Sequence, residues 1–179
     1  MEVLISIVGK QEVKGERDRS ELLTDGTMTV TPKGVQLFYR ESAATGMEGT
    51  DTTLTLQPEK VTLSRTGTHA GMLVLEHRRR HLCSYGTPYG DLMLGVFTEK
   101  MEQEMTENGG SVRVAYTLDV GGSMLSRQEL SVTDEKLRRI ALIQAHGRKL
   151  KAAEVELIHR LHCHEQVLFL GRERGLAAQ

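Results

Sequence analysis

The chain has 179 residues, a formal net charge of −1, no tryptophan and only 4% aromatic residues. The balanced charge argues against binding of phosphate or anionic lipid by the whole surface, because such binding needs a clear basic excess. So few aromatic residues also leave little for the stacking of nucleic-acid bases. We therefore expect neither a membrane nor a nucleic acid as partner.

The first segment, MEVLISIVGKQEV, alternates apolar residues from Val3 through Ile5 to Ile7, as a half-buried strand does. Its apolar run is too short for a signal peptide, and Glu2 stands where a signal peptide carries basic residues. The two cysteines of the chain lie far apart and show no disulfide-framework spacing. These features predict a cytoplasmic protein without an export signal or a membrane span.

From Val3 to Thr133 the dominant pattern has a period of two residues, with turn residues every eight to twelve positions. This pattern is typical of an all-β sandwich or barrel. About ten strands are predicted, with a charged loop before the second, at residues 3–7, 22–30, 35–39, 54–56, 61–63, 71–77, 81–85, 92–96, 112–120 and 130–132.

The links at residues 31–34, 57–60 and 108–110 are very short. Consecutive strands should therefore be antiparallel neighbours, because a parallel return needs a crossover of about a dozen residues. A long meander with one apolar face tends to close on itself, which removes its hydrogen-bonding edges. We predict that residues 1–133 form an antiparallel up-and-down β-barrel of about 8–10 strands, lipocalin-like or calycin-like, with a two-sheet sandwich as the alternative.

Two charged residues continue apolar faces of predicted strands. Glu41 follows the alternation that includes Tyr39, and Arg65 follows that of Val61 and Leu63. The up-and-down course places Glu41 and Arg65 inside the barrel at the same rim, one strand apart, with backbones about 10 Å from each other. Two interpretations remain open: a structural ion pair that closes the core, or charged groups of a ligand pocket.

The stretch YGTPYG at residues 85–90 falls at the same rim. Its Thr-Pro pair and glycines predict a turn, and Tyr85 and Tyr89 can supply apolar rings with hydroxyl groups. The loops ESAATGMEGTD and TGTHAG also fall there, whereas the opposite end has mostly tight turns. One end is therefore predicted to be a loop-rich mouth that can hold a small ligand, although the turn can equally serve folding alone.

The pattern changes near Thr133. Residues 134–179 are rich in strong helix formers, with a predicted N-cap at Thr133 or Asp134. One apolar stripe at helical spacing comprises Leu150, Ala153, Leu157, Ile158 and Leu161. The segment carries nine Lys/Arg against six Asp/Glu, a charge of +3, whereas residues 1–133 carry fourteen against eighteen, a charge of −4. We predict a C-terminal α-helical extension that lies on the barrel, docks a protein partner or forms a homodimer.

Several of these motifs resemble a known family. They are Tyr39 and Glu41 in YRE, Arg65 and Gly67 in RTG, and the turn residues Tyr85, Thr87, Pro88, Tyr89 and Gly90. Together with the surrounding strands they are similar to the YwiB-like proteins, small bacterial barrels of calycin or lipocalin-like architecture that are classed as a domain of unknown function. The resemblance covers about residues 1–133 and implies the fold. It implies no activity.

Two histidine-containing motifs have a structural and a functional interpretation. HRRRH at residues 77–81 is predicted to lie on a hairpin turn at the sealed end, where solvated charges are normal, or to bind phosphate locally. HRLHCHE places His159, His162 and Cys163 on one helix face, where they could bind zinc if a distant fourth ligand joined them. The alternative is a partly exposed amphipathic helix, and we predict no metal.

Cys83 and Ser84 are candidate nucleophiles, and His81 shares a strand face with Cys83. No nucleophile elbow, phosphate loop or paired-carboxylate motif accompanies them. A hydrolase is therefore the weakest of three hypotheses.

The leading hypothesis is a non-catalytic protein, without a cofactor, that binds a small, partly apolar or anionic ligand at the barrel mouth. The expected ligand-binding residues are Glu41, Arg65, Tyr85, Tyr89 and Tyr39. The alternative is a structural or interaction protein with a packed barrel, whose amphipathic C-terminal helix docks a partner or self-associates.

Overall fold

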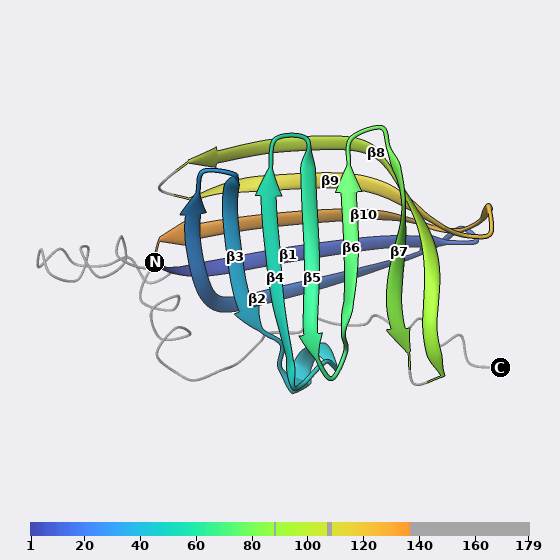
Figure 1. The fold of residues 1–179 in the computed structure, drawn as a ribbon, viewed down its shortest axis with the longest axis horizontal. Coiled ribbons are helices and arrows are strands. Elements are labelled where there is room, and N and C mark those ends of the chain that lie inside the picture. Colours follow the sequence, from blue (N-terminus) through green and yellow to red (C-terminus); the bar gives the residue numbers. More distant parts are fainter. Residues whose placement is uncertain (88, 107–108, 137–179) are drawn as a thin grey trace, which may run out of the picture.

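The computed structural model describes residues 1–87, 89–106 and 109–136 (Figure 1). Over these residues the chain forms ten β-strands and one short 3-10 helix, so the predicted all-β class and strand number are confirmed. The elements are β1 (Glu2–Val13), β2 (Glu16–Thr31), β3 (Gly34–Arg40), η1 (Ala43–Thr45), β4 (Thr50–Gln57), β5 (Lys60–Gly67), β6 (Gly71–Glu76), β7 (Arg80–Thr87), β8 (Gly90–Thr106), β9 (Gly109–Val120) and β10 (Ser123–Lys136). No helix in these ranges has the length and apolar character of a membrane span.

The strands form a closed barrel in which each pairs antiparallel with its neighbours in the sequence, and β1 closes the circle with β10. The closing ladder is long, running from Val3 opposite Lys136 to Glu12 opposite Arg127. The predicted meander is therefore confirmed over the alternative of two separate sheets. Strands β3 to β7 run across the direction of β9, β10 and β1, so the barrel has two crossed layers (Figure 1).

Strand β2 is longer than the sequence pattern predicts. Residues 16–21, expected as a charged loop, pair with β1 beyond the core, so that expectation is wrong. Both faces of this extension are exposed to solvent, and an ion pair between Arg17 of β2 and Glu12 of β1 joins its two strands. Further along, β2 leaves β1 and pairs with β3 from Thr27 onward. Gly26 lies at this change of partner, where an added Cβ would overlap the carbonyl oxygen of Phe38.

The predicted start of the C-terminal helix is also wrong. Strand β10 continues to Lys136, with Asp134 paired to Ile5 on one side and to Gly110 on the other. The Asp134 side chain is buried and accepts a hydrogen bond from the Gly110 amide at 3.1 Å, so it does not cap a helix. The predicted apolar stripe, zinc candidate and partner-docking helix lie outside the described residues.

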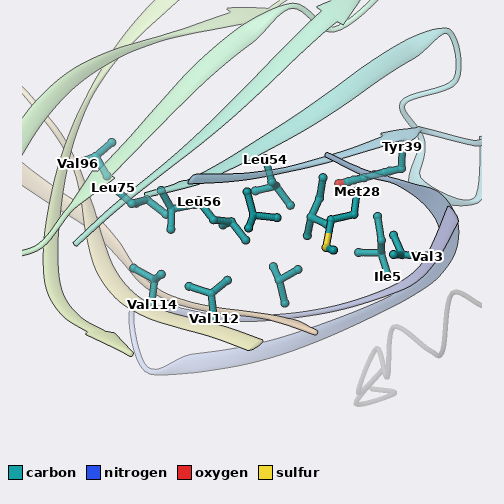
Figure 2. Packing of buried hydrophobic residues seen from close by; sticks show 14 of the residues in the cluster. Val3, Ile5, Met28, Tyr39, Leu54, Leu56, Leu75, Val96, Val112 and Val114 are labelled. Atoms are coloured by element: carbon teal, nitrogen blue, oxygen red, sulfur yellow. The ribbon is translucent and has the colours of Figure 1, made fainter. Parts of the chain in front are cut away.

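Inward-facing alternate residues fill much of the barrel (Figure 2). The buried apolar cluster draws on strands from all around the wall and comprises Val3, Ile5, Met28, Val35, Leu37, Tyr39, Leu54, Leu56, Val61, Leu75, Cys83, Val96, Val112, Val114 and Val132. Burial of this many apolar side chains is the main favourable term in folding. Around β6 and β7 the inward-facing residues line a cavity instead.

Candidate functional site

A polar row crosses the inner wall near the end where β3, β5 and β7 finish (Figure 1). The register pairs each residue of this row with the next, in the order Tyr39, Thr52, Arg65, Gly71 and Tyr85. Paired residues in a sheet point to the same side, so all five face inward. The prediction that Arg65 and the start of the YGTPYG stretch lie at the same rim is therefore confirmed.

Glu41 follows β3 and joins this row through an ion pair. Its Oε1 lies 3.6 Å from Arg65 Nε, and the side chains are 1% and 20% exposed for Glu41 and Arg65, respectively. Thr52 Oγ1 donates a hydrogen bond to the same carboxylate oxygen at 2.7 Å. The carboxylate is thus buried and the guanidinium is partly open, because Arg65 reaches from the core toward the cavity.

This ion pair leaves hydrogen-bonding capacity unused. Within the described part of the chain, neither Arg65 Nε nor Glu41 Oε2 has a hydrogen-bond partner, although both atoms are buried. Buried polar groups in native proteins are nearly always satisfied, and the exceptions are informative. A guanidinium carries five N–H donors in a planar fork, so Arg65 can hold a second acceptor beside Glu41.

The phenols of Tyr39, which is buried, and Tyr116, which is partly buried, lie near the guanidinium. Burial raises the pKa of Tyr39 above its ordinary range, the Glu41 carboxylate raises it further, and Arg65 opposes both. Burial also raises the pKa of Tyr116, on β9, to about 12, again with Arg65 acting in the opposite direction. Both hydroxyls are therefore protonated at neutral pH and can donate hydrogen bonds.

The barrel wall is weakly joined between β6 and β7. Only Gly71 and Tyr85 form a registered pair, whereas the next strand pair, β7 with β8, runs from Arg80–Phe97 to Thr87–Gly90. Farther along β6, the amide of Val74 donates to Cys83 Sγ at 3.3 Å in place of a backbone carbonyl. We call this stretch of wall, between residues 72–76 and 80–84, the β6–β7 seam.

A cavity of about 380 Å³ lies inside the barrel behind this seam. Its polar lining includes Arg65 and, on the opposite wall, Tyr116, Gln128 and Gln11. Its apolar lining is mainly leucine, contributed by Leu63, Leu73, Leu94, Leu118 and Leu130. Gly71 helps to form this space, because a side chain there would point inward from the middle of the polar row.

The five predicted ligand-binding residues do not all meet at the cavity. Arg65 and Tyr85 line it, and Glu41 holds Arg65 from the buried side. Tyr39 packs in the apolar cluster (Figure 2). Tyr89 is fully exposed in the turn between β7 and β8.

The sequence interpretation missed two contributors to the site. Tyr116 continues the apolar alternation of β9, so the same parity argument that identified Arg65 could have found it. Gly71 gave no signal by itself, because a glycine beside a turn usually serves the turn. Its position opposite Arg65 depends on register, which the structure supplies.

The HRRRH motif makes ion pairs within the barrel wall. Of HRRRH, Arg79 and His81 contact Glu76 at 3.2 Å and 2.9 Å, and Arg80 pairs with Asp119 at 2.6 Å. Residues 77–79 form the predicted hairpin turn. Among the side chains that the structure describes, no group of three or more His, Cys, Asp or Glu is placed to hold a metal ion.

The candidate nucleophiles Cys83 and Ser84 point to opposite sides of β7. Cys83 is buried and accepts the Val74 amide hydrogen bond, whereas Ser84 is exposed. His81, which shares the inward face of Cys83, is engaged with Glu76. Both nucleophiles nevertheless line the cavity.

Comparison with known proteins gives a family and a fold. Residues 5–132 match the family model described as a domain of unknown function, DUF1934. Among solved structures, the crystal structure of the ywiB protein from Bacillus subtilis is similar, with a TM-score of 0.66 and 20% sequence identity over 75% of this chain and 90% of that chain. No curated protein matches the chain. At this level of identity the structural similarity shows the fold alone.

Proposed function

The chain belongs to the DUF1934 family of domains of unknown function, as its YwiB-like motifs predict, and from this barrel fold we propose that it binds a small organic anion in the cavity beside Arg65. Binding, rather than catalysis, is the proposed role. The expected binding group is Arg65, positioned by Glu41, with Tyr85 at the rim and Tyr116 on the facing wall.

The observation that carries this proposal is the composition of the cavity wall. A volume of about 380 Å³ lies within the range of roughly 300–1,000 Å³ that is usual for small-molecule sites. Such sites are mainly apolar, with a few polar groups that converge and fix the ligand's orientation. The leucine lining and the cluster of Arg65, Tyr116 and Gln128 fit this description.

An anion is favoured over a neutral ligand because of the state of Arg65. Its Nε is buried without a hydrogen-bond partner in the described structure, and the carboxylate nearest to it is 3.6 Å away, beyond ideal hydrogen-bonding distance. A carboxylate or sulfonate at the guanidinium would add a charge-assisted hydrogen bond, which is roughly twice as strong as a neutral one. The protonated phenol of Tyr116 can donate to the same group.

The test is thermal melting of the wild type and two variants in the presence of a library of carboxylates, sulfonates and phosphates. A ligand at a concentration 100 times its dissociation constant stabilises the protein by about 2.7 kcal/mol. The melting temperature of a barrel of this size rises by roughly 3 °C for each kcal/mol. We expect at least one anion to raise the melting temperature of the wild type by about 8 °C. Arg65→Met should abolish that shift.

Gly71→Val is the second variant, because it leaves the ion pair intact and fills the part of the cavity next to Arg65. An added Cβ at Gly71 makes only ordinary contacts, the nearest being 3.4 Å from the Ser84 carbonyl oxygen, so this variant should fold. It should lose the anion-dependent shift as well. Anions that stabilise all three proteins equally, or none of them, would refute the proposal.

A further inference from the structure

Large apolar side chains are exposed on the outside of the barrel beside the cavity. Strands β6, β7 and β8 carry Met72, Leu82, Met93 and Phe97, and we call these four residues the outer patch. Leu82 pairs with Gly95, which lies between Met93 and Phe97, so the three apolar side chains are diagonal neighbours across β7 and β8. Met72 is 53% exposed and Leu82 is 64% exposed.

The cavity reaches the outer patch at Met72, beside the β6–β7 seam. On a strand, successive side chains point to opposite faces, so Leu73 and Cys83 face inward whereas Met72 and Ser84 face outward. All four nevertheless line the cavity. The lining of the cavity therefore includes residues from both faces of the wall at the seam, and it includes Met72 of the outer patch.

The seam is suited to form a passage through the wall because few backbone contacts cross it. The Gly71–Tyr85 pair holds the strands together at the rim. At the other end, His77 and Arg78 contact Thr98 of β8 rather than β7. Between these points, the described contacts include the Val74 amide bound to the Cys83 thiol, and a sulfur acceptor forms a weaker hydrogen bond than a carbonyl.

We propose, on the basis of the anion-binding function above, that the ligand is a chain-bearing amphiphile whose anionic head lies at Arg65 and whose apolar chain leaves the barrel through the seam to lie on the outer patch. A cavity of about 380 Å³ holds the volume of roughly a dozen waters, at about 30 Å³ each. A methylene group occupies about as much volume as a water, so a chain of up to about twelve carbons fits inside and only a longer chain must leave the cavity. The seam is lined by Leu73 and Met72, so it offers an apolar exit.

The experiment measures binding of linear alkanoates of 8, 12, 14 and 16 carbons to the full chain by calorimetry, below their micelle concentrations. If the chain stays in apolar surroundings, each methylene should raise the affinity about fourfold, the factor that corresponds to roughly 0.8 kcal/mol. We expect this rise to continue to hexadecanoate. A plateau beyond about twelve carbons would mean that the ligand is confined to the cavity, and would overturn the proposal.

A matched pair of double variants tests the outer patch. Met72→Ser with Leu82→Ser should lower the affinity for hexadecanoate at least tenfold and that for octanoate less than twofold. The control is Met124→Ser with Leu125→Ser, since these residues are similarly exposed, at 62% and 47%, but lie on β10 outside the cavity lining. The control should leave both affinities unchanged. Equal effects of the two double variants, or equal effects on both alkanoates, would refute the chain's position.

The two proposals fail in different ways. If other anions stabilise the protein through Arg65 but no alkanoate binds, the chain-bearing ligand is wrong and the anion site stands. If alkanoates bind equally well to the wild type and to Arg65→Met, both the anion site and the head position are wrong.

Discussion

The ion pair between Arg65 and Glu41 permits a quantitative prediction. Removing one partner of a buried ion pair typically costs about 3–5 kcal/mol, because the other charge is left without compensation. Without Arg65, the Glu41 carboxylate would be this uncompensated charge, because its side chain is only 1% exposed. Because the pair is separated by 3.6 Å and Arg65 is 20% exposed, we expect Arg65→Met to cost about 3 kcal/mol, at the lower limit.

The reverse substitution should be milder. In Glu41→Gln the amide oxygen can still accept the hydrogen bond from Thr52, and Arg65 can be reached by water through the cavity. We expect a loss of about 1 kcal/mol, close to that of one ordinary hydrogen bond. The double variant has no buried charge left unpaired, so it should lose only about 2 kcal/mol, which gives a coupling energy of roughly 2 kcal/mol.

Urea unfolding of the four proteins at pH 7.5 measures this cycle, and thermal melting provides a check. At roughly 3 °C for each kcal/mol, Arg65→Met should melt about 9 °C lower than the wild type. The reasoning is refuted if the two single losses add within about 0.5 kcal/mol, which is the scatter expected of independent sites. The two residues would then be neighbours without an energetic interaction.

Two further predictions concern the barrel itself. Stability should fall between about pH 10 and pH 12, because burial raises the pKa of Tyr116 to about 12 and the unfolded chain loses its phenolic proton first. Tyr116→Phe should remove roughly 2 kcal/mol of that loss, measured by urea titrations at pH 8 and pH 11.5, because the full effect of the shift, about 2.7 kcal/mol, is reached only above pH 12; identical losses in both proteins would contradict this. Gly26→Ala should cost about 3 kcal/mol, because its Cβ would overlap the Phe38 backbone, whereas Gly71→Ala should cost little. Chemical denaturation compares the two, and similar costs would show that β2 can shift at its bend.

The features that follow from local alternation could be predicted from the sequence. Strand number and antiparallel order follow from the period of two and the short links, and these are confirmed. The inward positions of Glu41 and Arg65 follow from the same parity, and their common rim follows from counting strands up and down. These predictions hold because side-chain alternation is a local property and short links make consecutive strands antiparallel neighbours.

The features that depend on the surroundings of a strand could not be predicted. Residues 16–21 have no apolar face because both sides of the β1–β2 extension meet solvent, so the pattern resembled a loop. Asp134 resembled a helix cap because the sequence does not reveal that Gly110 lies opposite it. Tyr89 lies in the turn beyond the rim, where strand parity no longer applies. In the sequence, β6 and β7 show the same alternation as strands that are fully paired. Their sparse pairing depends on the course of the barrel wall, which the alternation does not reveal.

The size of the cavity bears on where binding energy would come from. Left dry, about 380 Å³ would cost roughly 9 kcal/mol at about 24 cal/mol per Å³, which is comparable to the whole stability of a typical domain. Water must therefore be able to enter, and Arg65, Tyr116 and Gln128 can bind it where they lie. Along the leucine wall water has few partners, and replacing poorly held water with apolar groups increases affinity. The apolar part of a ligand should then supply most of the binding energy, while Arg65 determines which end enters first.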